Sequence, residues 1–467
     1  MQRRFVWRRR RQPRRNEHLR ASGEPCCNGT ACNAGLTCHA GTCDGDSGTI
    51  PGADSGSIID SGSDSTIGDA ASEAGDASPD ATLGDDANDA APDAGDAANE
   101  PGDAANEAGD AGPIPPSCQT GGAGIIDCPG GPNDAGESCC TSLEVTGGTY
   151  FRTYDPYNAD WTVTLSADGG PTGEADPASV SAFRLDKYEI MVGRFRQFVN
   201  AVSPPDGGAA WMPTQGSGRH THLNGGMGLA SGPNVDAGQT YETGWDTSWN
   251  SNVTPSTTPT GCLDPGAATW TTSVGAQELL PINCVNWYEV YAFCIWDGGF
   301  LPSEAEWEYA AAGGDQQRQY PWGSTDPGAA NEYAIYGCYY PGGTGACDAN
   351  SSQGPIGTLN IASVGSARLG AGRWGQLDLA GNLFENALDS YASYVNPCVD
   401  CAYLGGAVAP VVRGGDDFDV VYQTFGGSGA ASDTAAEARA EIRPTFRDNN
   451  GPTTRTLSTG GRCARTP

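Results

Sequence analysis

Cysteine is the residue type in this chain best suited to chemistry, with 17 copies among 467 residues. Five of them, Cys26, Cys27, Cys32, Cys38 and Cys43, fall within 18 residues and are separated mainly by small polar residues. Such density indicates a knot held by disulfide bonds. A zinc site is the alternative, but this segment lacks paired CxxC units and histidines at ligand spacing, so disulfides are favoured. Disulfides in turn predict an oxidising location, which is extracellular, periplasmic or at the cell surface.

The later cysteines are expected to form structural disulfides. We expect local bonds Cys338–Cys347 and Cys398–Cys401, and Cys262 is within reach of Cys284. The CxxC spacing of Cys398 and Cys401 also occurs in redox-active pairs, but no βαβ pattern surrounds it, which favours a structural bond. A second cystine-rich patch is formed by Cys118, Cys128, Cys139 and Cys140.

Histidine offers one candidate metal site among only four histidines. His220 and His222 stand two residues apart, so both imidazoles would face the same side of a strand. The sequence shows no third ligand for a metal ion. A surface loop is therefore the favoured interpretation of this pair.

Short strands and three helices must position these residues. Strands are expected over residues 142–145 and 149–154 and from Phe183, with a turn at Gly147–Gly148. The first helix follows, and its Phe195, Phe198 and Val199 recur at i, i+3 and i+4, which predicts one buried face.

The second and third helices carry clear start signals. Asn286 is a good N-cap for a helix that runs to Trp296, and Gly298–Gly299 ends it. Ser303 followed by Glu306 is a capping box that begins the third helix. Few helices and many Gly-rich loops predict an irregular α+β domain.

Composition divides the chain into four parts. Residues 1–20 are Arg-rich, 21–43 hold the cysteine knot, 44–117 form a spacer rich in Asp, Ala and Gly, and 118–467 form the folded domain. The formal net charge is −32, and residues 44–112 contain 18 acidic residues and no Lys or Arg. A segment with so little apolar surface is expected to be a disordered spacer, and an acidic interaction or calcium-buffering tail is the alternative.

The charged and apolar residues of these parts limit the possible functions. Residues 1–20 hold nine Arg and no apolar stretch, so they do not form a signal peptide as written; a targeting or nucleic-acid-binding arm and a misassigned start are the two interpretations. No apolar run reaches 18 residues, so no transmembrane helix is expected. The folded domain shows no basic patch with interleaved aromatic residues, which argues against nucleic acid as a partner.

Seven segments of the domain occur in the order typical of one family. They are Phe183–Glu189, Leu280–Tyr288, Leu301–Ala311 (LPSEAEWEYAA), Tyr320–Gly323 (YPWG), Leu377–Glu385 (LDLAGNLFE), Arg413–Gly415 and Gly461–Arg465. Together they resemble the formylglycine-generating enzyme, or sulfatase-modifying factor, family over nearly the whole region after Phe183. The resemblance implies a loop-rich α+β fold related to C-type lectins.

The resemblance also implies a chemistry and a departure from it. Family enzymes oxidise a sulfatase cysteine with molecular oxygen, using two copper-binding cysteines between the RGG element and the closing segment. Here residues 414–462 contain no cysteine, so no catalytic residue is assigned, and copper is expected only if the chain is nevertheless an oxidase. By resemblance Cys463 is structural and pairs with Cys294. The chain departs further from the family pattern at Asn386, where the family has Trp, and at Gly461, where it has Phe. Asp416–Asp417 replace a Ser and an aromatic residue.

Calcium is the ion that the resemblance favours. It assigns the carboxylates of Asp378 and Glu385 and the backbone carbonyls of Gly381 and Leu383 to a structural Ca²⁺ site, an all-oxygen set of the kind that Ca²⁺ prefers. The sulfur–histidine branch of the superfamily, which holds iron, is excluded by the spacing of the four histidines.

The sequence therefore predicts an exported member of this family with a binding or altered activity. A peptide or a glycan is the expected ligand. A formylglycine-generating oxidoreductase is the alternative, and a purely structural surface protein is a third possibility.

Overall fold

The structure of the chain is a computed structural model. The described residues are 36–39, 42–45, 114–119, 127–128, 137–154, 176–232, 239–255, 262, 268–341, 360–404, 409–416 and 435–467. The chain divides into two compact units, residues 1–100 and 101–467. In the first unit the described residues form a hairpin of β1 (Leu36–His39) and β2 (Thr42–Gly45), with Cys38 opposite Cys43. The Arg-rich segment, most of the predicted knot and nearly all of the predicted spacer lie outside the described residues.

The described residues of the second unit form four α-helices, of which α2 (Trp287–Trp296) and α3 (Glu304–Ala311) begin where their capping residues predict. The others are α1 (Val192–Val202) and α5 (Ala435–Glu441). The Asn286 side chain accepts a hydrogen bond from the backbone N–H of Glu289 at 3.0 Å, and Ser303 Oγ accepts one from Glu306 at 3.2 Å. These bonds satisfy amides that a helix leaves unpaired in its first turn. Within the described residues, every helix is too short or too polar to cross a lipid bilayer.

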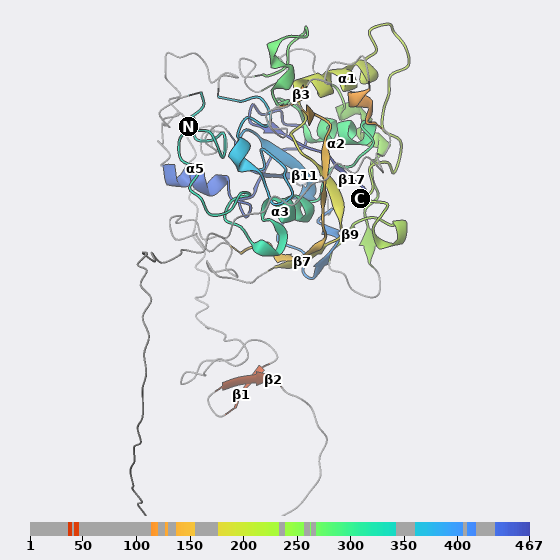
Figure 1. Cartoon of the computed structure of the whole chain (residues 1–467). Coiled ribbons are helices and arrows are strands. Elements are labelled where there is room, and N and C mark those ends of the chain that lie inside the picture. Colours follow the sequence, from red (N-terminus) through yellow and green to blue (C-terminus); the bar gives the residue numbers. More distant parts are fainter. Residues whose placement is uncertain are drawn as a thin grey trace, which may run out of the picture. The chain divides into compact units, whose positions relative to one another are not determined.

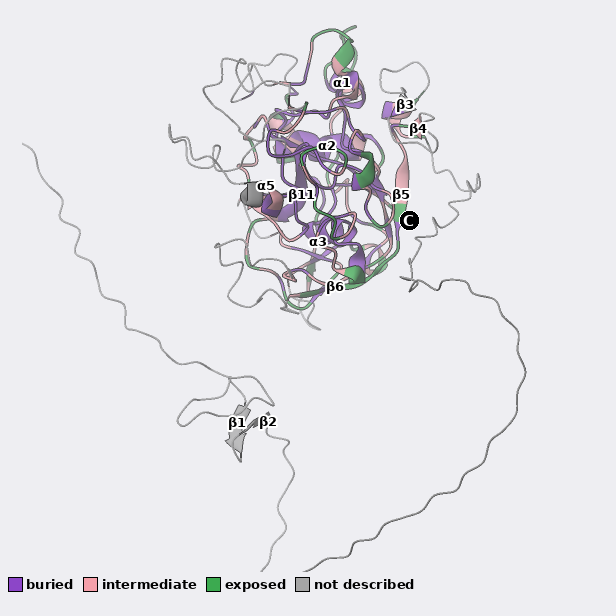
Figure 2. Cartoon of the chain, turned by 60° about the vertical axis from the view of Figure 1, so that its left-hand side comes forward, coloured by how far each residue is buried: buried purple, intermediate pink, exposed green. Residues whose placement is uncertain are grey.

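Helices α1 and α2 share the largest apolar core. Phe195, Phe198 and Val199 are buried, as their spacing predicts, and Phe198 meets Phe293 of α2 edge-to-face with ring centroids 5.8 Å apart. Helix α2 lies near the middle of the domain, with α1 above it and α3 below it (Figure 1). Both α2 and α3 are buried almost throughout (Figure 2), which fits the apolar sequence of α2.

The strands are short and form several small sheets. The sheets, in strand order, are β15 (Asp448–Asn449), β14 (Pro410–Arg413), β11 (Phe384–Ser390) and β16 (Thr459–Gly460); β17 (Ala464–Arg465), β8 (Phe183–Asp186) and β5 (Ser142–Val145); β12 (Cys398–Val399), β7 (Pro177–Val180) and β6 (Gly148–Phe151); β10 (Thr240–Tyr241), β9 (Ala230–Ser231) and β13 (Cys401–Ala402); and β3 (Asp127–Cys128) with β4 (Glu137–Ser138). Strands β5 and β6 are separated only by Thr146 and Gly147, but they pair with different partners. The α+β class with many loops is confirmed.

Buried ion pairs connect α1, β8, the end of α2 and β17. Arg194 of α1 is fully buried and contacts Asp186 at 3.1 Å and Asp297, just after α2, at 2.6 Å. Arg465 near the C-terminus contacts the same two carboxylates at 3.0 and 2.8 Å. Two guanidinium groups thus neutralise two buried carboxylates, a condition for keeping such charges out of water.

Candidate functional site

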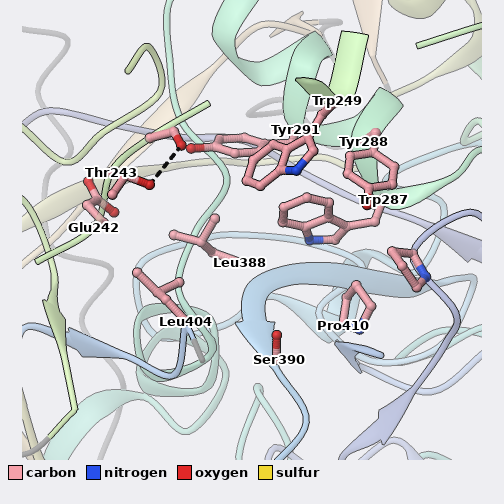
Figure 3. A pocket seen from close by; sticks show the side chains of 12 residues that line it. Glu242, Thr243, Trp249, Trp287, Tyr288, Tyr291, Leu388, Ser390, Leu404 and Pro410 are labelled. Atoms are coloured by element: carbon pink, nitrogen blue, oxygen red, sulfur yellow. Dashed lines mark hydrogen bonds between the residues drawn. The ribbon is translucent and has the colours of Figure 1, made fainter. Parts of the chain in front are cut away.

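A pocket of about 340 Å³ lies between α2 and β11. This volume is near the lower end of the range of small-molecule sites, roughly 300–1,000 Å³. Its walls are largely aromatic on one side and aliphatic on the other (Figure 3). The lining residues are Glu242, Thr243, Gly244, Trp249, Trp287, Tyr288, Tyr291, Leu388, Ser390, Leu404, Pro410 and Pro452.

The aromatic wall is held in place by packing and hydrogen bonds. Trp287 donates its indole N–H to the carbonyl of Ala387 at 2.8 Å, and its ring meets Trp249 edge-to-face at 5.7 Å. Tyr291 donates its hydroxyl to the carbonyl of Gly218 at 3.3 Å. Gly218 has φ +76°, and a Cβ there would come within 2.7 Å of the Tyr291 ring, so only glycine permits this close approach. The rings are therefore rigid surfaces for a ligand.

The 3-10 helix η5 (Thr247–Asn252) supplies Trp249 to this wall. Its N-cap Asp246 accepts a hydrogen bond from the backbone N–H of Ser248 at 2.8 Å. This bond fixes the start of the turn that carries Trp249.

The opposite wall depends on the two-residue alternation of β11. Leu388 and Ser390 face the pocket, so Asp389 points to the other side of the strand. There its carboxylate accepts the backbone N–H groups of Glu304 at 2.7 Å and Tyr403 at 2.6 Å. Burial raises the pKa of Asp389 to about 7, and Glu304 adds to the shift. Asp389 thereby joins β11 to the segment that carries Leu404.

One end of the pocket carries the acidic group Glu242, which is bonded to His220. The Glu242 carboxylate contacts His220 Nδ1 at 2.9 Å, and Nε2 of the same ring contacts Glu306 Oε2 at 3.1 Å. Burial opposes the charge on His220, but Glu306 and Glu242 outweigh it and raise the pKa to about 10. The ring is therefore an imidazolium that bridges two buried carboxylates.

The prediction of a surface loop at this histidine pair is wrong for His220. Its side chain is fully buried, because two carboxylates provide the partners that a buried cation needs. His222 is half-buried and packs against Phe300, with the rings 5.6 Å apart. In the part of the chain that the structure describes, no group of three or more His, Cys, Asp or Glu side chains is arranged to hold a metal ion.

The loop predicted to bind calcium is compact. Gly381 adopts φ +77°, and a Cβ there would fall 2.1 Å from the carbonyl oxygen of Ile335, so the tight turn requires glycine. Asp378 Oδ2 accepts the backbone N–H of Gly365 at 2.5 Å. Glu385 is fully buried on β11 and accepts the indole N–H of Trp307 at 2.8 Å.

A guanidinium group already pairs with one carboxylate of this loop. Arg462 Nε lies 2.9 and 2.7 Å from the two oxygens of Glu385, and its Nη2 donates to the carbonyls of Leu377 and Asp378 at 2.9 and 3.0 Å. Both carboxylate oxygens of Glu385 thus have a cationic donor. The donor set is chemically suited to Ca²⁺, but with Arg462 in this position Glu385 would have to exchange partners to bind it. Calcium at Asp378, Gly381, Leu383 and Glu385 therefore stays a prediction.

The structure contains five disulfides between described residues. They are Cys118–Cys140, Cys128–Cys139, Cys262–Cys284, Cys294–Cys463 and Cys398–Cys401. Cys338 is also disulfide-bonded, and Cys347, its expected partner, lies outside the described residues.

Two departures from the family pattern, Asn386 and Gly461, lie side by side. Asn386 of β11 is buried and donates its amide to the carbonyl of Gly460 at 2.8 Å. A Cβ on Gly461 would come 2.6 Å from a methyl group of Val290 and 3.8 Å from the backbone nitrogen of Asn386. The larger aromatic residues of the family pattern would need more room than these contacts leave. Asp416 is buried, and Asp417 lies outside the described residues.

Most of the pocket could not be recognised from the sequence. Glu242 and Trp249 belong to no motif, and Leu388 and Leu404 read as ordinary core residues. The available signal was the run of aromatic residues Trp287, Tyr288 and Tyr291, which indicates a buried helix face just as well.

Comparison with known proteins gives consistent matches over the folded region. The sulfatase-modifying factor enzyme 1-like domain matches residues 132–467. A formylglycine-generating enzyme of Streptomyces coelicolor is 34% identical over 139 residues, which cover 29% of this chain and 41% of that protein. The inactive C-alpha-formylglycine-generating enzyme 2 of Mus musculus is 29% identical over 186 residues, or 40% of this chain and 49% of that protein.

The chain thus aligns with less than half the length of these two relatives. Among solved structures, PvdO from Pseudomonas aeruginosa is 16% identical, with a TM-score of 0.40, over 71% of this chain and 100% of that chain.

Proposed function

Since the chain belongs to the sulfatase-modifying factor family, we propose that it is a ligand-binding member of that family that does not synthesise formylglycine. One observation carries the proposal: residues 414–462 contain no cysteine, where the family places its copper-binding pair. The name of the mouse relative, inactive C-alpha-formylglycine-generating enzyme 2, supports this proposal.

The state of the other cysteines supports this proposal. Each cysteine of residues 114–467 that the structure describes is disulfide-bonded. A disulfide sulfur is not a thiolate, and thiolates are the ligands that copper(I) requires. The described part of the domain therefore offers no pair of free thiols for the family's oxidation.

The aromatic pocket supplies the binding function. It is concave, mostly apolar and carries a small number of polar groups, which are the features of ligand sites. Trp249 and Tyr288 are only partly buried, so a ligand can reach their rings. Binding rather than covalent chemistry is what this set of side chains provides, with a peptide or a glycan as the ligand.

The domain is proposed to act outside the cytoplasm, in the extracellular space, in the periplasm or at the cell surface. The number of disulfides supports this location, because such bonds persist in oxidising compartments. Residues 44–117 are proposed to serve as an acidic spacer before the domain.

The test is an assay on the full chain with a sulfatase-type peptide that contains Cys-x-Pro-x-Arg, in the presence of copper(I) and oxygen. We expect no aldehyde in the peptide by mass spectrometry, while tryptophan fluorescence reports binding of a peptide or glycan. Formation of the aldehyde would refute the proposal and establish the alternative, a formylglycine-generating oxidoreductase, which the match to the Streptomyces enzyme favours.

A further inference from the structure

We propose that the pocket between α2 and β11 binds a neutral pyranose unit of a glycan. This inference rests on the proposed function, because it names the class of ligand for the same pocket. Three properties of the lining lead to it: rigid aromatic faces, unused hydrogen-bonding groups beside them, and the balance of charge.

The aromatic faces suit the apolar side of a sugar ring. The axial C–H bonds of a pyranose carry partial positive charge, and the face of an aromatic ring carries partial negative charge. Trp249, Trp287 and Tyr288 lie together, with ring centroids 5.2–5.8 Å apart, and present large flat surfaces to the pocket (Figure 3). Because Trp287 is fixed by its hydrogen bond to Ala387, stacking on this wall orders few additional side chains.

Polar groups beside these faces suit sugar hydroxyls. The indole nitrogens of Trp245, Trp287 and Trp307 all donate to protein acceptors, whereas Trp249 Nε1 has no acceptor among the described residues. Trp249 is partly exposed, so this donor is open to a ligand at the pocket. The Tyr288 hydroxyl likewise makes no hydrogen bond within the described part of the chain. An indole donor and a phenol hydroxyl beside an apolar face match a polyhydroxylated ring.

The charges favour a neutral sugar. The lining contains one acidic residue, Glu242, and neither Lys nor Arg. A sulfated or uronic-acid sugar would therefore meet a carboxylate without any cation to pair with. Residues 118–467 hold 37 acidic and 16 basic residues, a formal charge of −21, which also repels anionic ligands.

A cationic ligand is disfavoured by the contacts of Glu242. Its carboxylate is already paired with the His220 imidazolium at 2.9 Å, so a second cation would compete for the same oxygens. Trp249 Nε1 is a donor, and a cation cannot accept its hydrogen bond. These contacts favour a neutral ligand that can both donate and accept.

The test uses the full chain and a panel of oligosaccharides. The neutral probes are maltohexaose, cellohexaose, mannohexaose and chitohexaose, the anionic probe is hexagalacturonate, and the peptide contains Cys-x-Pro-x-Arg. Tryptophan fluorescence and isothermal titration calorimetry measure binding. At least one neutral hexasaccharide is expected to bind at least ten-fold more tightly than hexagalacturonate.

Two matched variants test whether the sugar binds in this pocket. Trp249→Phe keeps an aromatic ring but removes the N–H, and we expect about five-fold weaker binding, the effect of one lost hydrogen bond. Trp374→Phe is the control, because Trp374 is also partly exposed but lies outside the pocket and donates to Thr146 Oγ1 at 3.1 Å. It should bind the sugar like the unmodified chain. The melting temperature of both variants shows that the fold is retained.

The outcomes separate the two proposals. If the peptide binds and none of the neutral sugars does, the inference of a sugar ligand is wrong and the proposed binding function stands. Tighter binding of hexagalacturonate, or an equal loss in both tryptophan variants, would also overturn the inference. If no member of the panel binds, both the inference and the proposed function fail.

Discussion

The fully buried His220 bridges Glu242 of the pocket and Glu306 of α3, and this arrangement links the pocket to the start of a helix. A histidine that gains two carboxylate partners on folding has a folded pKa, about 10, above its ordinary value. Its stabilising effect is therefore complete below pH 6.5 and is lost as the pH rises through about 10.

For His220→Gln we expect a weaker dependence of stability on pH between 6.5 and 10. One proton bound only in the folded state makes the free energy of unfolding fall by up to about 1.4 kcal/mol per pH unit. Denaturant titrations at several pH values measure the slope. Asp389 and Glu308, with pKa values of about 7 and 8, titrate in both proteins and cancel in the comparison.

His222→Gln is the control for this measurement. Burial lowers the pKa of His222, so its titration lies below this pH range. An unchanged slope in His220→Gln would contradict the imidazolium bridge.

Arg462 and Glu385 form an ion pair whose effect on the free energy of unfolding can be measured with single substitutions. Both side chains are fully buried. For Arg462→Met we expect a loss of about 3–5 kcal/mol in the free energy of unfolding, because Glu385 remains as a buried carboxylate without its partner. For Arg373→Met we expect less than about 1 kcal/mol, since Arg373 and Asp315 are 33% and 73% exposed. Similar losses of unfolding free energy in the two variants would contradict the idea that burial makes the Arg462–Glu385 pair more important than an exposed pair.

At the scale of elements, the capped helices follow directly from short sequence signals. The two capping boxes act within four residues, so the sequence is sufficient to predict where α2 and α3 begin. Strand pairing is different. Strands β5 and β6 are neighbours in sequence, yet β5 pairs with β8 and β6 pairs with β7, because their partners are chosen by packing over longer distances.

The loop from Asp378 to Glu385 provides a prediction about calcium. A calcium ion bound only to the folded chain would stabilise it, so the predicted site implies that EDTA lowers the melting temperature of the chain. Differential scanning fluorimetry with EDTA and with added calcium measures this. A melting temperature that neither EDTA nor added calcium changes would contradict the calcium site and indicate that Arg462 is the partner of Glu385.

At the scale of the whole molecule, one disulfide joins distant parts of the domain. Cys294 in α2 and Cys463 are 169 residues apart, whereas Cys398 and Cys401 are three apart. Replacing Cys294 and Cys463 together by Ala is expected to destabilise the domain by roughly 2–5 kcal/mol, because a long loop gains much entropy when it is released in the unfolded state.

The double Ala variant of Cys398 and Cys401 is the matched control, since these residues are equally buried but close a very short loop. We expect it to lose less stability than the first variant. Thermal unfolding of both variants gives the comparison, and an equal or larger loss in the short-loop variant would contradict the argument from loop entropy.

Local patterns in the sequence are sufficient to recognise the family and to predict where α2 and α3 begin. The sequence also shows directly that residues 414–462 contain no cysteine. Each of these depends on residues close together in the chain, or on short segments kept in a fixed order. The tertiary structure alone decided that Glu242 and Trp249 face Leu388 across one pocket. It also decided that a histidine expected on a surface loop lies between two carboxylates. Such contacts join residues far apart in sequence, and the packing of loops without periodic patterns brings them together.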